Sequence, residues 1–328
     1  MTTVSVNVTG VLSMDEVVQG DVALSCPGSS GLYVSVALAR LGHPVQFWSR
    51  VGEDFDWTLL DELQPDAIHW RLQTVTGPSA RLHLVYDARG HIARFGYELG
   101  VGRDLDAHEL HDDFWAAPWV WLGAAPAGYH LEVARRAAGG GQKVLLSPQG
   151  DYDADWVTFS RLLPHLSGLF LNSREAQQLC SESLDGAVAR LTEGRPQLLC
   201  SITCGERGAL LAWGETLFHV GICREPVVNA TGAGDTYAAA LLHYLLAGRP
   251  PEDGLRFAAV AAALSLRGFA YRAIPSHGQV LDEIARRSTP IAVASAPLRS
   301  EEAREWLAME GRGARQDTMV RSLTDRSL

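Results

Sequence analysis

The chain has 328 residues, of which 47% are hydrophobic and 20% are charged, and its formal net charge is −10. This composition is ordinary for a soluble globular enzyme, whereas a nucleic-acid-binding surface is normally basic. No apolar run approaches the roughly 18 residues of a membrane span, and the first residues lack the regions of a secretory signal. The five cysteines are scattered and lack paired zinc spacing, which fits reduced thiols. We therefore expect a cytoplasmic protein whose partners are small molecules, not nucleic acid or a membrane.

The lysine content limits how this chain could hold phosphate groups. Lys143 is its single lysine. A Walker A loop needs Gly-Lys-Ser/Thr, and a protein kinase needs a lysine on its third strand, so neither motif can be placed here. Any ATP-dependent chemistry would have to hold phosphates through backbone amides, arginine and metal.

Most of the chain alternates between predicted strands and predicted helices. Short apolar runs predict strands at residues 4–11, 44–49, 119–123 and 169–172. Residues 143–149 predict a strand with its loop, and residues 198–211 predict two strands joined by a glycine-containing loop. Ala- and Leu-rich segments predict helices that end near Gly42 and that span residues 128–138, 255–266 and 278–287. This alternation predicts an α/β fold with a mainly parallel central sheet covered by helices.

Three further segments lie outside this alternation. Residues 76–100 alternate polar and apolar side chains around Asp87-Ala-Arg-Gly90, which predicts a β-hairpin that could also pack on the main sheet. Residues 301–309 predict one more helix. The charged residues 311–328 lack periodicity, which favours an exposed or disordered tail.

The strongest chemical signal lies in residues 227–248. A short apolar run leads into Thr231-Gly-Ala-Gly234, and a helix with leucines at three- and four-residue spacing follows. A glycine turn at a helix N-terminus leaves several N–H groups unpaired, and the helix dipole adds partial positive charge there. Asp235 stands beside this predicted anion site, as a general base acting on a hydroxyl would. Alternatively, Asp235 is a helix-dipole residue after a plain glycine turn.

The segment Thr-Gly-Ala-Gly-Asp-Thr at residues 231–236 resembles the C-terminal signature of the PfkB (ribokinase-like) carbohydrate kinase family. The resemblance covers residues 1–287 and implies a ribokinase-like three-layer sandwich. It also implies a small β-sheet lid over the acceptor site, built from about residues 11–26 and 76–100. In this family the aspartate, here Asp235, is the general base, and Gly232, Ala233 and Gly234 would form the anion hole. Residues 288–328 would be a C-terminal extension, expected to be partly disordered.

The resemblance assigns two further segments to the nucleotide and implies ATP and Mg²⁺ as cofactors. Asn172 and Glu175 match the family's Asn-x-x-Glu, in which Glu175 would order Mg²⁺ through water. The alternative is an N-cap asparagine and a first-turn glutamate. Thr203, Gly205 and Gly208 resemble a Thr-x-Gly-x-x-Gly loop against the phosphates, and the alternative is a plain hairpin turn. Many relatives bind a monovalent cation through an aspartate where this chain has Asn229, so binding of that cation stays open.

On the acceptor side the chain departs from the family pattern. The resemblance assigns substrate binding to Asp15, Gly28, Ser29 and Tyr33. Ser29 stands in place of a glycine, and Tyr33 stands in place of an asparagine. Residues 147–151 also differ, with Ser147, Gln149 and Asp151 at the altered positions. An aromatic ring in place of an amide favours an acceptor with a ring face or an apolar part over ribose or fructose.

The sequence therefore predicts an ATP-dependent phosphotransferase acting on an alcohol group of a sugar or nucleoside-like molecule. One alternative is a kinase of a specialised secondary-metabolite or antibiotic sugar hydroxyl. Another is a non-catalytic ligand-binding protein on a kinase frame, against which the intact Asp235 and Gly232-Ala-Gly234 argue. The expected partners are ATP and the small-molecule acceptor, and a homodimer through the lid is one assembly that the resemblance allows.

Overall fold

The computed structural model describes residues 4–63, 68–86, 92–148 and 156–312. Within these residues one sheet of ten strands has the order β14-β13-β12-β11-β10-β9-β8-β1-β4-β5. Its strands are β1 (Val6–Thr9), β4 (Val45–Gly52), β5 (Ile68–Val75), β8 (Trp119–Leu122), β9 (Lys143–Leu146), β10 (Gly168–Asn172), β11 (Leu199–Thr203), β12 (Ala209–Trp213), β13 (Thr216–Val220) and β14 (Val293–Pro297). The strands from β5 to β11 are parallel to their neighbours, and β12 to β14 are antiparallel. The mainly parallel sheet predicted from the sequence is confirmed.

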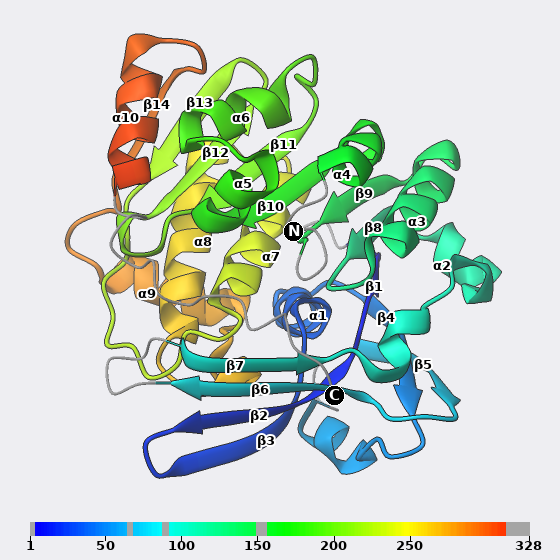
Figure 1. Ribbon diagram of the computed structural model, residues 1–328. Coiled ribbons are helices and arrows are strands. Elements are labelled where there is room, and N and C mark those ends of the chain that lie inside the picture. The colour runs from blue at the N-terminus through cyan, green and yellow to red at the C-terminus, as the bar shows by residue number, and fades with distance from the viewer. Residues whose placement is uncertain (1–3, 64–67, 87–91, 149–155, 313–328) are drawn as a thin grey trace.

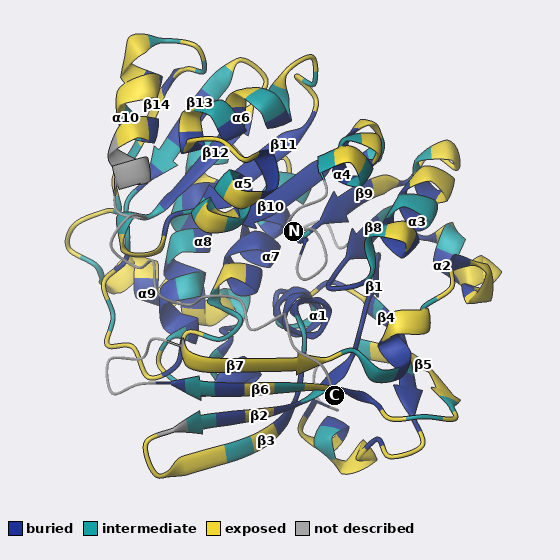
Figure 2. Cartoon of the chain, viewed as in Figure 1, coloured by how far each residue is buried: buried dark blue, intermediate teal, exposed yellow. Residues whose placement is uncertain are grey.

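Helices cover both faces of this sheet and form two hydrophobic cores. One core contains the helices α1 (Ser30–Arg40), α7 (Ala233–Leu246), α8 (Pro251–Ser265) and α9 (His277–Arg286). The other contains α2 (Asp112–Ala116), α3 (Ala127–Gly139), α4 (Trp156–Leu162), α5 (Ser173–Cys180), α6 (Leu184–Thr192) and α10 (Glu301–Arg312). Figure 2 shows α1 as buried, whereas α10 exposes much of its surface. This arrangement confirms the three-layer sandwich.

Side-chain alternation along single strands explains why both faces are covered. On β4, Phe47 belongs to the core beneath α1, and its neighbour Trp48 belongs to the core beneath α2 and α3. All four residues of β1 are buried. A strand that is buried on both sides needs a helix layer on each face. Short 3₁₀ helices join several elements: η1 (Trp57–Leu63), η2 (Gly100–Asp104), η3 (Ala107–Glu109), η4 (Leu163–His165), η5 (Gly205–Arg207) and η6 (Ala270–Ala273).

A second sheet forms the small lid that the family resemblance implied. Its strands are β2 (Ser13–Gln19), β3 (Val22–Gly28), β6 (Ala80–Tyr86) and β7 (Ile92–Glu98), in the order β3-β2-β6-β7. These strands lie together at the bottom of Figure 1, apart from the main sheet. The antiparallel pairing of β6 and β7 confirms the predicted hairpin, and its expected turn at residues 87–90 lies outside the described residues.

The chain continues as ordered structure beyond residue 287. Strand β14 pairs antiparallel with β13 at the edge of the main sheet, and α10 packs in the same core as α6. The sequence predicted the helix but not the strand. The part of the C-terminal extension that the structure describes is therefore attached to the sandwich, and the boundary at residue 287 stays a prediction. Residues 313–328, expected as a tail, lie outside the described residues.

Among the described residues, no helix has the length and apolar character needed to cross a membrane.

Candidate active site

The N-terminus of α7 presents the glycine turn and the carboxyl group singled out from the sequence. Gly232 is the N-cap, with φ at 78°, and Asp235 is the third residue of the helix. A Cβ atom on Gly232 would lie 2.3 Å from Cδ1 of Tyr33, so both the backbone angle and the packing require glycine here. The N–H groups of Gly232 and Gly234 donate to no group in the described part of the chain, whereas the Ala233 N–H donates to the Ala230 carbonyl at 3.2 Å. Two unpaired N–H groups therefore face the space beside Asp235.

Asp235 is buried, with 8% of its surface exposed. Burial, together with the smaller effect of the negative charge of Glu175, raises its pKa to about 8. Desolvation disfavours the charged carboxylate, and a nearby like charge does the same. A carboxyl group with its pKa near neutrality, beside unpaired N–H groups, is suited to taking a proton from a hydroxyl.

Asp15 and Gly28 meet at the base of the lid. Asp15 is 2% exposed, and Oδ1 accepts a hydrogen bond from the Ser13 hydroxyl at 2.5 Å. Oδ2 is buried and has no hydrogen-bond partner. Burial raises the pKa of Asp15 to about 7. A Cβ on Gly28 would lie 1.7 Å from Asp15 Oδ2, so glycine at position 28 leaves room for this carboxyl group.

Ser29 and Tyr33 sit on the first turns of α1. Ser29 caps α1 by accepting from the Leu32 N–H at 3.4 Å, and its φ of 111° is one that glycine adopts more readily. Tyr33 is 2% exposed and packs against Gly232, and its hydroxyl is buried without a partner. Burial, and then the charges of Asp15, Cys26 and Asp235, raise the pKa of Tyr33. The hydroxyl therefore lies among the acceptor-side residues and the α7 turn, and the Tyr33 ring is buried against Gly232.

The lid also touches the glycine turn, through a residue that the sequence analysis did not single out. Tyr86 is the last residue of β6, and its hydroxyl forms a hydrogen bond with the Thr231 hydroxyl. Asn229 Oδ1 accepts from the Thr231 N–H at 3.0 Å, and its Nδ2 is buried without a partner. The only sequence signal for Tyr86 was its place at the end of an alternating strand, which does not reveal a contact 145 residues away.

Asn172 and Glu175 form a capping box at the start of α5. Glu175 N–H donates to Asn172 Oδ1 at 2.8 Å, and Asn172 N–H donates to Glu175 Oε2 at 2.8 Å. This is the helix-cap arrangement weighed as the alternative. Glu175 nevertheless lies close enough to Asp235 to raise the pKa of that carboxyl group. A carboxylate and an amide oxygen are hard ligands that suit Mg²⁺, so the metal role of this pair remains a prediction.

The predicted phosphate loop lies beside this cap. Thr203 pairs in register with Asn172 at the ends of β11 and β10. Gly205 has φ at 60° and open space around it, whereas a Cβ on Gly208 would lie 1.9 Å from the Val220 carbonyl oxygen. Packing against β13 accounts for Gly208 without a ligand, and the open surroundings of Gly205 leave room for one. Ser147 follows β9, and Gln149 and Asp151 lie outside the described residues.

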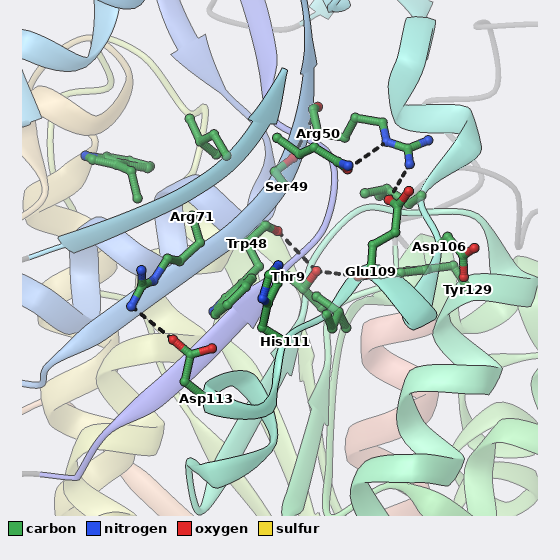
Figure 3. A pocket seen from close by; sticks show the side chains of 15 residues that line it. Thr9, Trp48, Ser49, Arg50, Arg71, Asp106, Glu109, His111, Asp113 and Tyr129 are labelled. Carbon is green, nitrogen blue, oxygen red and sulfur yellow. Dashed lines mark hydrogen bonds and ion pairs between the residues drawn. The ribbon is translucent and has the colours of Figure 1, made fainter. Parts of the chain in front are cut away.

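A groove of about 470 Å³, seen from close by in Figure 3, includes Trp48, Leu110 and Tyr129 from the core that does not contain α7. Thr9, Trp48 and Arg71 line it from three adjacent strands. Arg50 pairs with Glu109 and Arg71 pairs with Asp113 along its rim, as the dashed lines show. None of the predicted site residues lines this groove. It is therefore separate from the glycine turn at the start of α7.

The model of the "pfkB family carbohydrate kinase" matches residues 26–273, which is more than half of the chain. The chain belongs to this family. It is 25% identical to a cytidine kinase of Thermococcus kodakarensis over 76% of this chain and 91% of that protein. It is 29% identical to a fructokinase of Salmonella typhimurium over 70% of this chain and 80% of that protein. The structure of Arabidopsis thaliana ribokinase complexed with ribose and ATP matches 86% of this chain and 98% of that chain, with a TM-score of 0.73 and 24% identity. This PfkB protein is a sugar or nucleoside kinase, a phosphotransferase with an alcohol group as acceptor.

Proposed function

We propose that this PfkB kinase transfers the γ-phosphoryl group of ATP to a hydroxyl of a sugar or nucleoside-like molecule, with Asp235 as the general base. The observation that carries the proposal is the buried Asp235 carboxyl group beside the unpaired N–H groups of Gly232 and Gly234. This arrangement supports proton removal and phosphate binding at one place.

Each group of the proposed site has a separate chemical role. Asp235 accepts the hydroxyl proton as the acceptor oxygen attacks the γ-phosphorus. The N–H groups of the Gly232-Ala-Gly234 turn stabilise the negative charge of the transferring phosphoryl group, with Ala233 joining once its bond to Ala230 opens. Mg²⁺ held near Asn172 and Glu175 would offset charge on the phosphates. Thr203 and Gly205 lie next to that position and would border the nucleotide phosphates.

Two unpaired polar atoms define the acceptor side. Asp15 Oδ2 can accept a hydrogen bond from an acceptor hydroxyl, and the Tyr33 hydroxyl can donate or accept one. Burying such atoms without partners is unfavourable, so a bound acceptor that pairs them gains affinity. Because Tyr33 places an aromatic side chain where the family pattern has an asparagine, we propose a nucleoside-like acceptor over free ribose or fructose. The similarity to a cytidine kinase supports this choice, and the similarity to a fructokinase keeps sugars in the test.

A second candidate is a specialised secondary-metabolite or antibiotic sugar. The departures at Ser29, Tyr33 and Ser147 favour it, because each changes a residue on the acceptor side. Both candidates use the same phosphoryl-transfer chemistry.

A panel of nucleosides, common sugars and amino sugars incubated with ATP and Mg²⁺ tests the proposal. Mass spectrometry of the products identifies any phosphorylated acceptor, and kcat/KM ranks the acceptors. A nucleoside with the highest kcat/KM supports the proposal, an amino sugar supports the second candidate, and ribose or fructose as the best acceptor contradicts our interpretation of Tyr33. ATP turnover on none of them would argue against both.

A further inference from the structure

A cavity of about 560 Å³ lies away from the residues of the candidate active site, where α1, α8, η6 and α9 meet. Four arginines from four separate segments line it, and these are Arg40, Arg267, Arg272 and Arg286. No aspartate or glutamate is among its described lining residues, and neither Asp15, Asp235 nor the glycine turn contributes to it. This concentration of positive charge contrasts with the net charge of −10 of the whole chain.

Three glutamates outside the lining, Glu62, Glu225 and Glu283, offset part of this charge. The Arg272 guanidinium donates to both carboxylate oxygens of Glu62, at 2.9 and 3.0 Å. Glu283 contacts Arg267 at 3.3 Å, Arg286 at 3.8 Å and Arg287 at 3.0 Å, so one carboxylate is shared among three guanidinium groups. Glu225 also contacts both Arg267 and Arg287. The arrangement leaves excess positive charge at a concave surface, which attracts anions.

The backbone fixes the positions of the cavity walls. The Arg40 guanidinium donates to the carbonyl oxygens of Tyr271 at 2.9 Å and Ile274 at 2.8 Å. Ser276 and Gln279 form a capping box at the first turn of α9 and also line the cavity. These bonds hold the Arg40 guanidinium in one orientation at the cavity wall. Guanidinium groups match the geometry of oxyanions.

We propose that this cavity binds a small, multiply charged phosphate anion, such as a diphosphate or a phosphorylated metabolite. Its volume accommodates a small molecule, and arginine matches the geometry of phosphate oxygens. Carboxylate oxygens offer a similar geometry with less charge per group, so a tricarboxylate serves as the comparison in the test.

Hydrogen bonds connect this cavity to the glycine turn. The Leu266 carbonyl, next to Arg267, accepts from the N–H groups of Val228 at 2.8 Å and Asn229 at 3.3 Å. An anion bound at Arg267 would limit the motion of residues 228–230, which precede Thr231. We therefore infer that the bound anion acts as an effector of phosphoryl transfer. The effector role rests on the proposed function, whereas binding of the anion does not.

Calorimetric titration of the full chain with pyrophosphate tests the binding. A non-hydrolysable ATP analogue is present in one series, so that the phosphate-binding turn is filled, and absent in a second. The test variant is Arg272→Gln with Arg286→Gln. The matched control is Arg256→Gln with Arg304→Gln, two arginines that do not line the cavity.

We expect pyrophosphate to bind whether or not the ATP analogue is present. Its affinity should be at least about tenfold weaker in the test variant, since hydrogen bonds to charged groups contribute about 1.5–3 kcal/mol, and unchanged in the control. Citrate should bind more weakly than pyrophosphate. No binding, equal loss in both variants, or citrate binding as tightly would overturn the proposal. Should the double variant misfold, Arg286→Gln alone, whose side chain is 68% exposed, repeats the test. In kinase assays, a pyrophosphate effect on KM that is lost only in the test variant supports the effector role, and a purely ATP-competitive effect in every variant contradicts it.

Discussion

At the residue scale, the candidate site combines two buried carboxyl groups with one buried hydroxyl. Burial raises the pKa of Asp15 to about 7 and that of Asp235 to about 8, and the Tyr33 hydroxyl lies close to both charges. Perturbed carboxyl groups of this kind gather at catalytic sites, although structural clusters produce them too. Their different surroundings separate the roles, because only Asp235 adjoins the unpaired N–H groups of the glycine turn.

The raised pKa of Asp235 predicts the pH dependence of catalysis. In the free enzyme the carboxyl group keeps its proton below about pH 8, and a general base must lose that proton. We expect kcat/KM, which reports the free enzyme, to rise with pH from 6 to about 8 and then level off. A profile already flat above pH 5 would mean that Asp235 has the pKa of an ordinary aspartate or is not the base.

Thermal unfolding supplies the control for this pH prediction. The folded chain holds protons on Asp15 and Asp235 that the unfolded chain releases near pH 4, so these groups make stability fall as pH rises from about 4 to 8. Asp235→Asn should therefore weaken the fall of Tm across this range. An identical fall in the variant would contradict the raised pKa itself.

Tyr33 predicts a separate effect on acceptor binding. Its hydroxyl has no partner in the structure, so Tyr33→Phe should leave Tm unchanged or slightly higher. If the hydroxyl pairs with the acceptor, KM for the acceptor should rise roughly tenfold, as for the loss of one hydrogen bond, while KM for ATP stays constant. Tyr129→Phe, a buried tyrosine on the other face of the sheet, is the control. An unchanged acceptor KM in Tyr33→Phe would leave Tyr33 with a packing role only.

The sequence could predict the identity of these residues better than their orientation. The substitution at Tyr33 is visible in a single motif, but the direction of its ring depends on Gly232, which lies far along the chain. The burial of Asp15 likewise depends on Gly28 packing against it. Contacts between distant segments set both features, so local pattern alone does not determine them.

At the scale of single elements, the start of α5 joins a structural role to a proposed metal role. Glutamine can replace glutamate in a capping box, so Glu175→Gln should preserve the helix cap and Tm. Removing its charge should raise the Mg²⁺ concentration needed for half-maximal activity, lower kcat, and lower the pKa seen in the pH profile. Glu252→Gln, in the first turn of α8, is the matched control. If Glu175→Gln leaves both the Mg²⁺ dependence and the pH dependence of activity unchanged, the helix cap is the only role of Glu175.

The Asn-x-x-Glu pattern fits both a helix cap and a metal site, because Asn172 and Glu175 could serve in either role. A cap is decided by local hydrogen bonds, whereas the proposed metal role also depends on phosphate groups that no local pattern shows. For the same reason the sequence did not predict β14. Residues 293–297, Val-Ala-Ser-Ala-Pro, carry little hydrophobic alternation, and the strand exists because β13 offers it an edge to pair with.

Exposed aromatic residues on the lid predict a homodimer. Phe95 and Tyr97 lie two residues apart on β7, are 60% and 37% exposed, and contact each other with ring centroids 6.4 Å apart. Exposed aromatic pairs of this kind often mark protein interfaces. We propose a homodimer through the lid and expect Phe95→Glu to convert it to a monomer in light-scattering measurements. Val157→Glu, on the exposed side of α4, should leave the dimer intact. A wild-type monomer at micromolar concentration would rule out this assembly.

At the scale of the whole molecule, the sandwich brings distant segments to the N-terminus of α7. The lid contributes Asp15 and Tyr86, α1 contributes Tyr33, and α5 contributes Glu175. The alternation of strands and helices was enough to predict the fold, and the family match over residues 26–273 agrees with it. The closed arrangement of the acceptor side followed only from the structure.

The central claim is that Asp235 is the base in phosphoryl transfer, and one comparison tests it most directly. Single-turnover phosphorylation of the best acceptor is measured for the wild type, for Asp235→Asn, and for Asp253→Asn, an equivalent change at an exposed aspartate on α8. General-base catalysis contributes about 10²–10⁴-fold, so Asp235→Asn should lose at least about a hundredfold in rate while retaining ATP affinity and fold, and Asp253→Asn should behave as the wild type. An Asp235→Asn rate above about a tenth of the wild-type value would contradict the account.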